Sequence, residues 1–524
     1  MNKKLLNTVM IILTLIIIPK VQSQTPNSTW GRSIGSSLND WGAYSVTDKN
    51  GNTYVTGYFS SPITIGSQTF STTTGNGTET DIFICKYDQS GNVEWAKTFG
   101  GTGSDESRAI TLDTNNNVCI AGRFVNTADF DGQQLSTTSP LYDGYIAVFN
   151  PSGTLQMLHQ SGVSSNSFDN ASYFSLHVTK NNELLAGGSM HGTIASQSNT
   201  SGTSRAFLVN VNIQSGLINS AKVYGFNNSN VTTITTDTLG NVFWGIRASI
   251  TAGTCYLYKG PNIGSFQYSH TINNSGSDEI FQIIPNNNGG CVAIGIYDGN
   301  YFINAYDQYL SAVWNYPSSS SATTLDRLIP SKSPDYFYLV GTYNNFNSLN
   351  QCGQNIQAPT GVGKDIYVQR RNFNFSLGCD STFVFGVKAN FGEVRGIGLD
   401  ESNNVYVSGY FSGNVAGSYL TSAGSTDIYT FKFGNNLIPT GLDNQGNKPV
   451  VVIYPNPAKD IVTIGNVPSG STVNITDITG RIVYSTKTNN DEITINTSEF
   501  VNGVYIIQVE NNGSVANKKL VISK

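Results

Sequence analysis

A short strand that ends in glycine recurs along most of this chain, and it restricts the fold more than any other feature. Its seven copies are Tyr54–Gly57, Cys119–Gly122, Leu184–Gly187, Val242–Gly245, Val292–Gly295, Tyr338–Gly341 and Tyr406–Gly409. Repetition at such long, similar intervals is typical of repeat proteins, in which each unit buries its apolar face against its neighbours. We call these seven glycines the marker glycines.

The residues around each marker glycine predict further strands. Before most copies come an apolar strand and a turn rich in Asp, Asn and Gly, such as Asp48–Asn52, and such turns favour hairpins. A third strand follows each copy, as at Asp81–Ile84, and a fourth is clearest at Val93–Lys97. Four antiparallel strands in a repeated unit predict the blades of a β-propeller. Seven units favour seven blades, and six or eight remain open because units four to six match less well.

The two ends of the repeat region complement each other. The seventh unit is one strand short after Phe433, whereas an extra strand, Thr29–Gly35, precedes the first unit. This extra strand matches the fourth strand of the first unit, Glu94–Gly100, in sequence. We therefore predict that it completes the last blade and closes the ring, which removes two exposed sheet edges.

The composition favours the same fold class. Charged residues make up 12% of the 524 residues, and there are 54 glycines, against roughly 25% charged residues in an ordinary domain. Polar character comes instead from Asn, Ser, Thr and Gly, which favour turns over helices. The fold class is therefore all-β. The net charge of −5 excludes the basic footprint of a nucleic-acid-binding protein.

The repeats resemble the SBBP family of β-propeller repeats. That pattern runs from a Gly-Gly-x-x-x-Asp turn to a D-x-x-G-N turn, a Y-V-x-G strand and an Asp-started strand. Units one, two and seven match best, unit four lacks the acidic residue, and unit six lacks the D-x-x-G-N turn. The resemblance implies a propeller scaffold over residues 24–434 and implies no particular ligand.

The first 23 residues have the layout of a secretory signal peptide. Lys3 and Lys4 precede an almost wholly apolar run from Leu5 to Ile18, and Val21–Ser23 offers a cleavage site. The apolar run of about 14 residues is short for the ~20 needed to span a bilayer. We therefore expect cleavage after Ser23, export by the Sec machinery, and no transmembrane segment in the mature chain.

The chain changes character after Gly434. Residues 435–448 are rich in Gly, Pro and Asn without an apolar period, and they predict a linker. Residues 449–524 contain seven short strand-like segments separated by turn residues, which predict a small Ig-like β-sandwich.

This last block resembles the type A C-terminal sorting domain of type IX secretion. The matching positions are Tyr454, Pro455, Asn456 and Pro457 of the opening motif, Gly480 and Arg481 of the D-x-x-G-R turn, Gly503 and Tyr505 of the G-x-Y strand, and Lys518 and Lys519 near the end. The resemblance implies a Gram-negative cell, passage through the periplasm and then the type IX machinery. It also implies removal of the domain near the linker, with the cargo released or attached to surface lipopolysaccharide.

One pattern in the repeats could carry chemistry. An acidic residue lies 15 to 18 positions before the marker glycine in six units, namely at Asp40, Asp105, Asp169, Asp278, Asp326 and Glu393. In a propeller these positions would form a ring of carboxylates near one mouth of the central channel, where a cation or polar ligand could bind. Carboxylates that accept backbone N–H bonds at turns are the alternative, which we favour. We expect no cofactor, with Ca²⁺ as the candidate metal if the ring binds one.

Six cysteines accompany the predicted export. Cys352 and Cys379 lie in and after one irregular loop and form the best candidate disulfide. The other four fall in strand-like runs, where buried free thiols are at least as good an interpretation.

No catalytic signature is found among the short motifs of hydrolases, metalloproteases or phosphate-binding enzymes. We therefore expect a non-catalytic binding or adhesion protein, with a glycan, lipopolysaccharide or protein as its ligand. The alternative is a secreted hydrolase or lyase that acts on polysaccharide from a propeller scaffold.

Overall fold

The chain divides into two compact units, one within Ser23–Ile438 and the other containing Pro439–Lys524, and each is described by itself. The candidate disulfide, the signal peptide and the linker all lie outside the residues that the structure describes. The computed structural model describes residues 28–75, 77–137, 141–162, 169–199, 201–248, 254–273, 278–317, 323–344, 349–351, 354–356, 364–373, 381–385, 390–413, 420, 422–434, 452–465, 467–477, 481–511 and 514–524.

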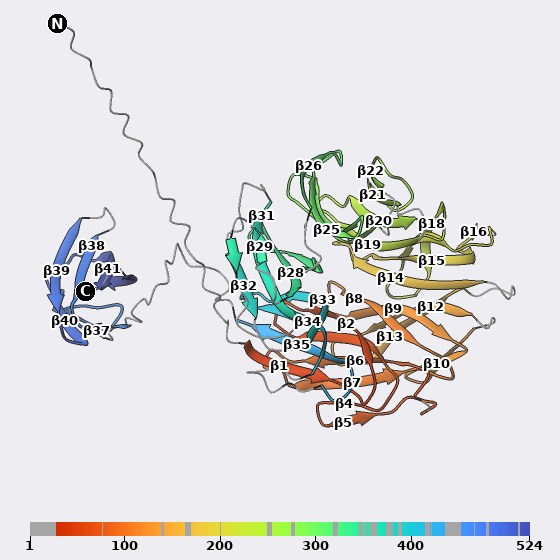
Figure 1. Ribbon diagram of the computed structural model, residues 1–524, viewed down its shortest axis with the longest axis horizontal. Coiled ribbons are helices and arrows are strands. Elements are labelled where there is room, and N and C mark those ends of the chain that lie inside the picture. Colours follow the sequence, from red (N-terminus) through yellow and green to blue (C-terminus); the bar gives the residue numbers. More distant parts are fainter. Residues whose placement is uncertain are drawn as a thin grey trace, which may run out of the picture. The chain divides into compact units, whose positions relative to one another are not determined.

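The first unit is built from four-stranded antiparallel sets that follow one another around a ring (Figure 1). All seven marker strands and all seven predicted third strands are present. Within the described residues there are seven sets, a number compatible with seven blades, and a single parallel pair, Lys364 with Asn390, joins the last two sets into one sheet. The seven sets, in chain order, are β2 Asp40–Thr47, β3 Thr53–Phe59, β6 Asp81–Tyr87 and β7 Val93–Phe99; β8 Glu106–Leu112, β9 Val118–Val125, β12 Tyr142–Phe149 and β13 Leu155–Ser161; β14 Asn170–Val178, β15 Leu184–Ile194, β17 Arg205–Val211 and β18 Ile218–Asn227; β19 Asn230–Thr236, β20 Val242–Ala248, β21 Thr254–Gly260 and β22 Tyr268–Asn273; β23 Glu279–Pro285, β24 Cys291–Tyr297, β25 Asn300–Tyr306 and β26 Ala312–Pro317; β27 Arg327–Pro330, β28 Tyr336–Asn344, β31 Lys364–Asn372 and β32 Ser381–Phe385; and β33 Asn390–Leu399, β34 Val405–Ser412, β35 Asp427–Phe433 and β1 Ser28–Ile34.

The first strand of each set is the inner strand of the ring. The inner strands β2, β8, β14, β19, β23, β27 and β33 contact one another in that order, and β33 contacts β2 again. Figure 1 shows β2, β8 and β33 close together towards the middle of the propeller. The apolar cores lie between neighbouring sets, as where Tyr54 and Ile84 of the first set pack with Ile120 and Tyr145 of the second. Stacking against both neighbours therefore stabilises each set.

The predicted closure of the ring is confirmed. Strand β1 pairs antiparallel with β35, with Trp30 opposite Lys432. The Trp30 indole Nε1–H donates to the carbonyl oxygen of Gln89 in the first set (3.0 Å). Trp95 on β7 repeats this contact by donating to the Pro151 carbonyl oxygen (3.0 Å). The closing strand therefore makes the same contact with its neighbour as the fourth strand of the first set.

A bulge in the inner strand explains most of the marker glycines, but in the fourth set the equivalent residue is Ile246 and not Gly245. In the second set, Ser107 pairs with Gly122 and Ala109 with Ala121, so Arg108 is the extra, bulged residue. A Cβ atom at Gly122 would overlap the carbonyl oxygen of Glu106. Only glycine leaves room for this backbone approach. In the third set the equivalent residue is Gly188, which meets the Ser172 carbonyl, and not the predicted Gly187.

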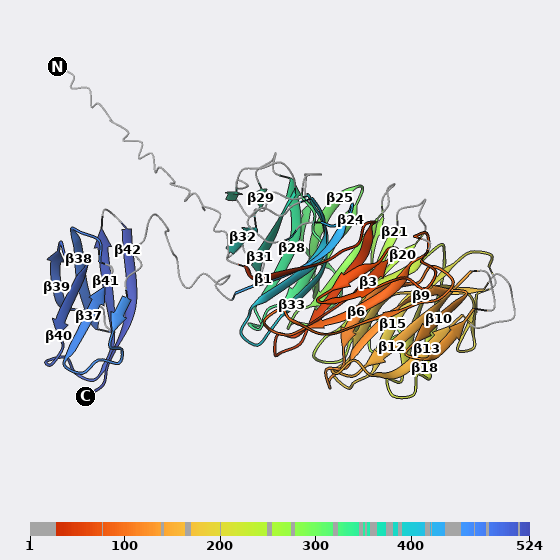
Figure 2. The same ribbon diagram turned by 90° about the horizontal axis from the view of Figure 1, so that it is seen from below.

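The second unit is a two-sheet β-sandwich, and Figure 2 shows its strands lying alongside one another. All seven predicted strands are present in the described part of this unit. One sheet contains β36 Val452–Tyr454, β37 Ile461–Gly465 and β40 Glu492–Asn496, and the other contains β39 Ile482–Thr488, β38 Ser471–Asp477, β41 Gly503–Asn511 and β42 Ser514–Ile522. Their inward side chains, such as Val462, Val473 and Ile507, form one core. This arrangement is compatible with an Ig-like sandwich.

No helix in the described part of the chain combines the length and the apolar character that crossing a bilayer requires.

Candidate functional site

Three of the six predicted acidic residues occupy equivalent positions. Asp40, Asp105 and Asp278 each lie 17 residues before a marker glycine, and all three are buried. Asp40 accepts hydrogen bonds from the Ser36 backbone N–H (2.6 Å) and hydroxyl (3.0 Å). Asp105 accepts the backbone N–H groups of Gly101 (2.9 Å) and Val125 (3.0 Å). These carboxyl groups therefore hold loops where neighbouring sets meet, which supports the structural alternative.

The other three acidic residues leave this register. In the sixth set the carbonyl oxygen that faces the marker Gly341 belongs to Thr324, so Thr324 is equivalent to Glu106 and Asp326 lies further along the chain. Asp326 accepts the Val394 backbone N–H (2.8 Å). Asp169 precedes β14 by one residue, and its carboxylate lies 3.6 Å from His191 Nδ1. Glu393 is at the position of Glu106, one residue after that of Asp105. The expected ring of six equivalent carboxylates is thus wrong in its register, because bulges and loop lengths differ between the sets.

The Asp-Asn-Gly turns are hairpin turns whose carboxylates are already hydrogen-bonded. Asp48 Oδ1 accepts the backbone N–H groups of Asn50 and Asn52, both at 2.9 Å, and Asp48 Oδ2 accepts the Asn52 amide at 2.7 Å. The same pattern recurs at Asp113, Asp237 and Asp400. Among the described residues, no group of three or more His, Cys, Asp or Glu side chains is arranged to hold a metal ion.

A different set of charged residues comes together where the inner strands begin. In the second set, Glu106 binds two guanidinium groups, Arg108 through Nε (2.8 Å) and Arg123 through Nη2 (2.5 Å). Arg108 lies over the ring of Phe174 on the next inner strand, 5.1 Å from its centroid. Burial, followed by the charge of Glu106, raises the pKa of the nearby Tyr58. One carboxylate thus pairs with two cations here, which leaves one positive charge in excess.

The same glutamate position carries ion pairs in two further sets. Glu393 lies 2.6 Å from Arg395 on β33, and Glu279 on β23 accepts a hydrogen bond from Arg247 at 3.1 Å. Burial raises the pKa of Glu279, and the positive charges of Arg247, Arg395 and Arg327 oppose this shift. Glu279 therefore lies within electrostatic reach of β27 and β33 as well as of its own neighbour.

Aromatic side chains adjoin these charges. The ring of Tyr44 on β2 lies under Arg395, 5.9 Å from the guanidinium carbon to the ring centroid. Trp41, with 40% of its surface exposed, meets Tyr410 edge-to-face at 5.9 Å. The ring centroids of Phe281 and Tyr301 lie 6.1 Å apart. Charged groups and aromatic faces therefore share one end of the inner strands.

We define the inner-strand cluster as these charged and aromatic residues. It comprises Trp41, Tyr44, Tyr58, Glu106, Arg108, Arg123, Phe174, Arg247, Glu279, Phe281, Tyr301, Arg327, Glu393, Arg395 and Tyr410. Except for Glu393, the cluster was not predicted from the sequence. A usable signal existed, since Glu-x-Arg occurs twice at the start of an inner strand, at Glu106–Arg108 and Glu393–Arg395.

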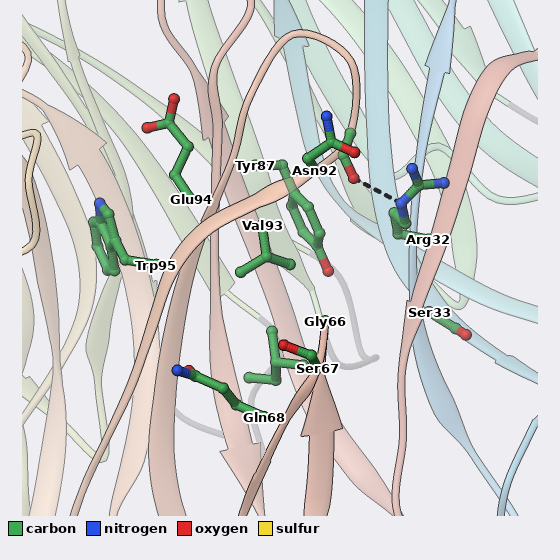
Figure 3. A pocket seen from close by; sticks show the side chains of 12 residues that line it. Arg32, Ser33, Gly66, Ser67, Gln68, Tyr87, Asn92, Val93, Glu94 and Trp95 are labelled. Carbon is green, nitrogen blue, oxygen red and sulfur yellow. Dashed lines mark hydrogen bonds between the residues drawn. The ribbon is translucent and has the colours of Figure 1, made fainter.

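A surface groove of about 360 Å³ lies elsewhere, between the closing strand and the first set (Figure 3). Figure 3 shows Arg32 and Tyr87 on its walls, and Arg32 Nε donates to the Gly91 carbonyl oxygen at 2.6 Å. These contacts belong to the closure of the ring, so we assign the groove a structural role.

Histidines and thiols do not converge on the cluster. His159 and His177 hydrogen-bond to Ser161 and Thr236 respectively, both at 2.8 Å. Burial lowers the pKa of His177 to about 4, which keeps it neutral. The four described cysteines, Cys85, Cys119, Cys255 and Cys291, are buried and free, and burial raises the pKa of Cys85 to about 12. They are thiols of the apolar cores.

The sorting-motif residues stabilise the edges and turns of the sandwich. Asn456 Oδ1 accepts the Val521 backbone N–H (2.8 Å), and the Tyr505 hydroxyl donates to the Val501 carbonyl oxygen (3.0 Å). Arg481 Nε donates to Asp477 (3.0 Å) across the turn. Tyr454, Pro455, Pro457, Gly503, Lys518 and Lys519 lie within or beside β36, β41 and β42, whereas Gly480 lies outside the described residues. The motif therefore connects the first strand of the sandwich to the last.

Comparison with known proteins assigns the C-terminal region. Residues 452–523 match the family described as "Secretion system C-terminal sorting domain". The chain therefore carries a type IX sorting domain, which makes it a secreted cargo destined for the cell surface or the extracellular space.

Three further likenesses are distant. A WD repeat-containing protein of Acanthamoeba polyphaga mimivirus is 30% identical over 156 residues, which cover 28% of this chain and 11% of that protein. PorZ of Porphyromonas gingivalis, a surface component of type IX secretion, is 12% identical with a TM-score of 0.26, covering 94% of this chain and all of PorZ. YCF48 bound to a D1 peptide is 9% identical with a TM-score of 0.41, covering 80% of this chain and 98% of YCF48. No function is taken from these likenesses.

Proposed function

We propose that this chain is a non-catalytic binding or adhesion protein that presents the inner-strand cluster as its binding surface. The observation that carries the proposal is the gathering of three arginine-bound glutamates and the exposed Trp41 ring at one end of neighbouring inner strands. Such a mixture of charged donors and aromatic faces is common where proteins bind polar ligands. A rigid ring would hold these groups in place before the ligand arrives.

The proposal against catalysis rests on the same residues. The glutamates of the cluster are bound to arginines, and Asp326 is buried and accepts a backbone N–H. Neither arrangement favours a free general base beside a nucleophile. A polysaccharide hydrolase or lyase is the alternative that the test must exclude.

The proposal also covers the repeat type and the route. We infer that the units are SBBP repeats, that residues 1–23 are a signal peptide read by the Sec machinery, and that the chain crosses the periplasm. We further infer that type IX secretion removes the sorting domain near residues 435–448. The mature chain would then be released or attached to lipopolysaccharide.

A glycan array and a turnover screen on the same purified chain test the binding role. We expect retention of one glycan class and no new reducing or unsaturated ends after prolonged incubation. Stoichiometric binding with catalytic release of products would contradict the proposal. The screen is repeated with Ca²⁺ and with a chelator, which also tests whether a metal contributes.

A further inference from the structure

The inner-strand cluster contains more positive than negative side chains. Its five arginines are Arg108, Arg123, Arg247, Arg327 and Arg395, and its three glutamates each pair with at least one of them. Arg108 and Arg123 share Glu106, and Arg327 is the one arginine of the cluster without a glutamate partner among the described residues. Excess positive charge that is held by fixed side chains on one surface favours an anionic ligand.

The arginine without a glutamate partner, Arg327, lies where β27 meets β33. Arg327 Nε donates to the Arg395 carbonyl oxygen (3.0 Å), and its Nη1 donates to the Asp326 carbonyl oxygen (2.6 Å). Both acceptors are neutral, and within the described part of the chain Arg327 makes no ion pair with a carboxylate. Burial, followed by the positive charge of Arg395, lowers the pKa of Arg327. The positive charge of Arg395 thus disfavours the charged form of Arg327, whereas Tyr44, Asp326 and Glu393 favour it, and a bound anion would add to the favourable interactions.

The nearest acidic groups leave this excess in place. The Asp326 carboxyl group is buried and hydrogen-bonds to the Val394 backbone, so it does not bind Arg327. Burial raises its pKa to about 7, which weakens its negative charge at neutral pH. Glu393 binds Arg395 and remains 44% exposed. An incoming carboxylate or sulfate group would therefore meet two guanidinium groups and one glutamate that is already bound to Arg395.

The aromatic neighbours narrow the class of ligand. Trp41 and Tyr44 both lie on the inner strand β2, and the ring of Tyr44 lies under Arg395. Trp41 contacts Tyr410 on β34, the second strand of the last set. Sugar rings and similar amphipathic groups bind the faces of exposed aromatic rings, while arginine forks bind carboxylate or sulfate groups in a bidentate manner. The geometry points to an acidic glycan, with its carboxylate or sulfate on Arg327 and Arg395 and its sugar rings on the exposed face of Trp41. This inference rests on the proposed binding function and specifies its ligand.

The test measures binding of the full chain to galacturonate hexamers, to the same hexamers as neutral methyl esters, and to a sulfated heparin hexamer. We expect the esters to bind at least ~10-fold more weakly than the acid, since a charge-assisted pair is lost. The acid and the heparin hexamer separate carboxylate from sulfate recognition. Affinity for the preferred anion should fall with added salt.

Variants assign the binding to the cluster. Arg395→Gln and Arg327→Gln should each weaken acid binding by roughly 10-fold or more. Lys97→Gln is the matched control, because Lys97 also pairs with one carboxylate (Asp131, 2.5 Å) and is similarly exposed at 30% against 35% for Arg395. The control should bind like the unaltered chain. Trp41→Ala should weaken binding of the acid without changing its salt dependence.

Each outcome decides between the inference and the proposed function. Equal binding of acid and ester, or unchanged affinity in both arginine variants, overturns the acidic-glycan inference while a binding role stands. Tighter binding of poly-glutamate than of every hexamer also overturns it, in favour of an acidic peptide. Absence of any binding on the unbiased array, with turnover of a polysaccharide, contradicts the proposed function itself. Thermal melting of each variant confirms that the fold is retained.

Discussion

In both the propeller and the sandwich, the start of the unit contacts a strand near its end, but the contacts differ in extent. In the propeller, seven residues of β1 join the last set through a full antiparallel ladder that links residues 28–34 to 428–433. In the sandwich, the chain near Asn456 and Ala458 meets β42 through a side-chain hydrogen bond to Asn456 and a short bridge at Ala458, which makes two backbone hydrogen bonds. The propeller has its cores between the sets, so a broken closure exposes core on both sides. The sandwich has a single core, to which strands of both sheets contribute buried side chains.

Removal of the closing contact should therefore affect the propeller most. Trp30→Ala should destabilise the propeller by about 3–5 kcal/mol, because Trp30 is 8% exposed and packs against Tyr87 and Tyr406. The measurement is the denaturant midpoint of the propeller transition, with the sandwich transition as an internal reference. Trp95→Ala is the matched variant, and it should cost less because Trp95 is only partly buried. Equal losses would contradict a special role for the closing strand.

The bulge offers a second way to test the account of the ring. Gly122→Ala should destabilise the propeller by about 2–3 kcal/mol, because the new Cβ overlaps the Glu106 carbonyl and the bulge must shift. Gly225→Ala on β18 is the control, since nothing lies within 4 Å of its Cβ position. Thermal melts of both variants give the comparison. A neutral Gly122→Ala would mean that the marker glycines are not required by the bulges.

Buried carboxyl groups should make the propeller sensitive to pH. Burial is the main cause that raises the pKa of Asp143 to about 6, of Asp40 to about 7 and of Asp105 to about 8, from 3.8. The folded state thus binds these protons more tightly than the unfolded state. The contribution of these three groups to the free energy of unfolding is complete below about pH 4 and is lost as the pH rises through about 6 to 8.

The melting temperature of the propeller should accordingly fall between pH 5 and pH 9, by roughly 2–4 °C for each kcal/mol lost. Asp105→Asn should reduce this pH dependence, because the amide cannot ionise. The measurement is calorimetry across the pH range, with the sandwich transition as the reference. A propeller that gains stability over this interval would contradict the assignment of protonated, buried carboxyl groups.

The smallest effect is expected in the sandwich. Asn456→Ala removes the acceptor for the Val521 N–H and should destabilise the sandwich by about 1 kcal/mol. The propeller transition should not move. A loss several times larger would show that the sandwich depends on its closure as strongly as the propeller does.

The sequence was sufficient to predict the repeated sets because each set repeats its own local signals. The Asp48 turn and the Tyr54–Gly57 strand indicate a hairpin without reference to the rest of the chain. The closing strand was predictable for the same reason, since Thr29–Gly35 repeats Glu94–Gly100. The sandwich strands followed from their alternation of apolar residues and turns.

The inner-strand cluster could not be predicted by counting residues from the marker glycines. A bulge adds one residue to most inner strands, as between Val394 and Gly396, and it shifts which side chains are equivalent. Asp326 and Glu393 were grouped with Asp105 because the count allowed 15 to 18 residues, although neither stands at the position of Asp105. Pairs such as Glu279 with Arg247 join different sets, so only the closed ring brings them together.

Hydrogen–deuterium exchange on the full chain, with and without the galacturonate hexamer, tests the central claim most directly. The claim is that the propeller binds its ligand where the inner strands begin. We predict slower exchange around Trp41, Glu106 and Glu393 in the presence of the hexamer, and no change in the sandwich or at the turns near Asn50 and Asn404. Protection confined to those turns or to the sandwich, with none at the inner strands, would contradict the account.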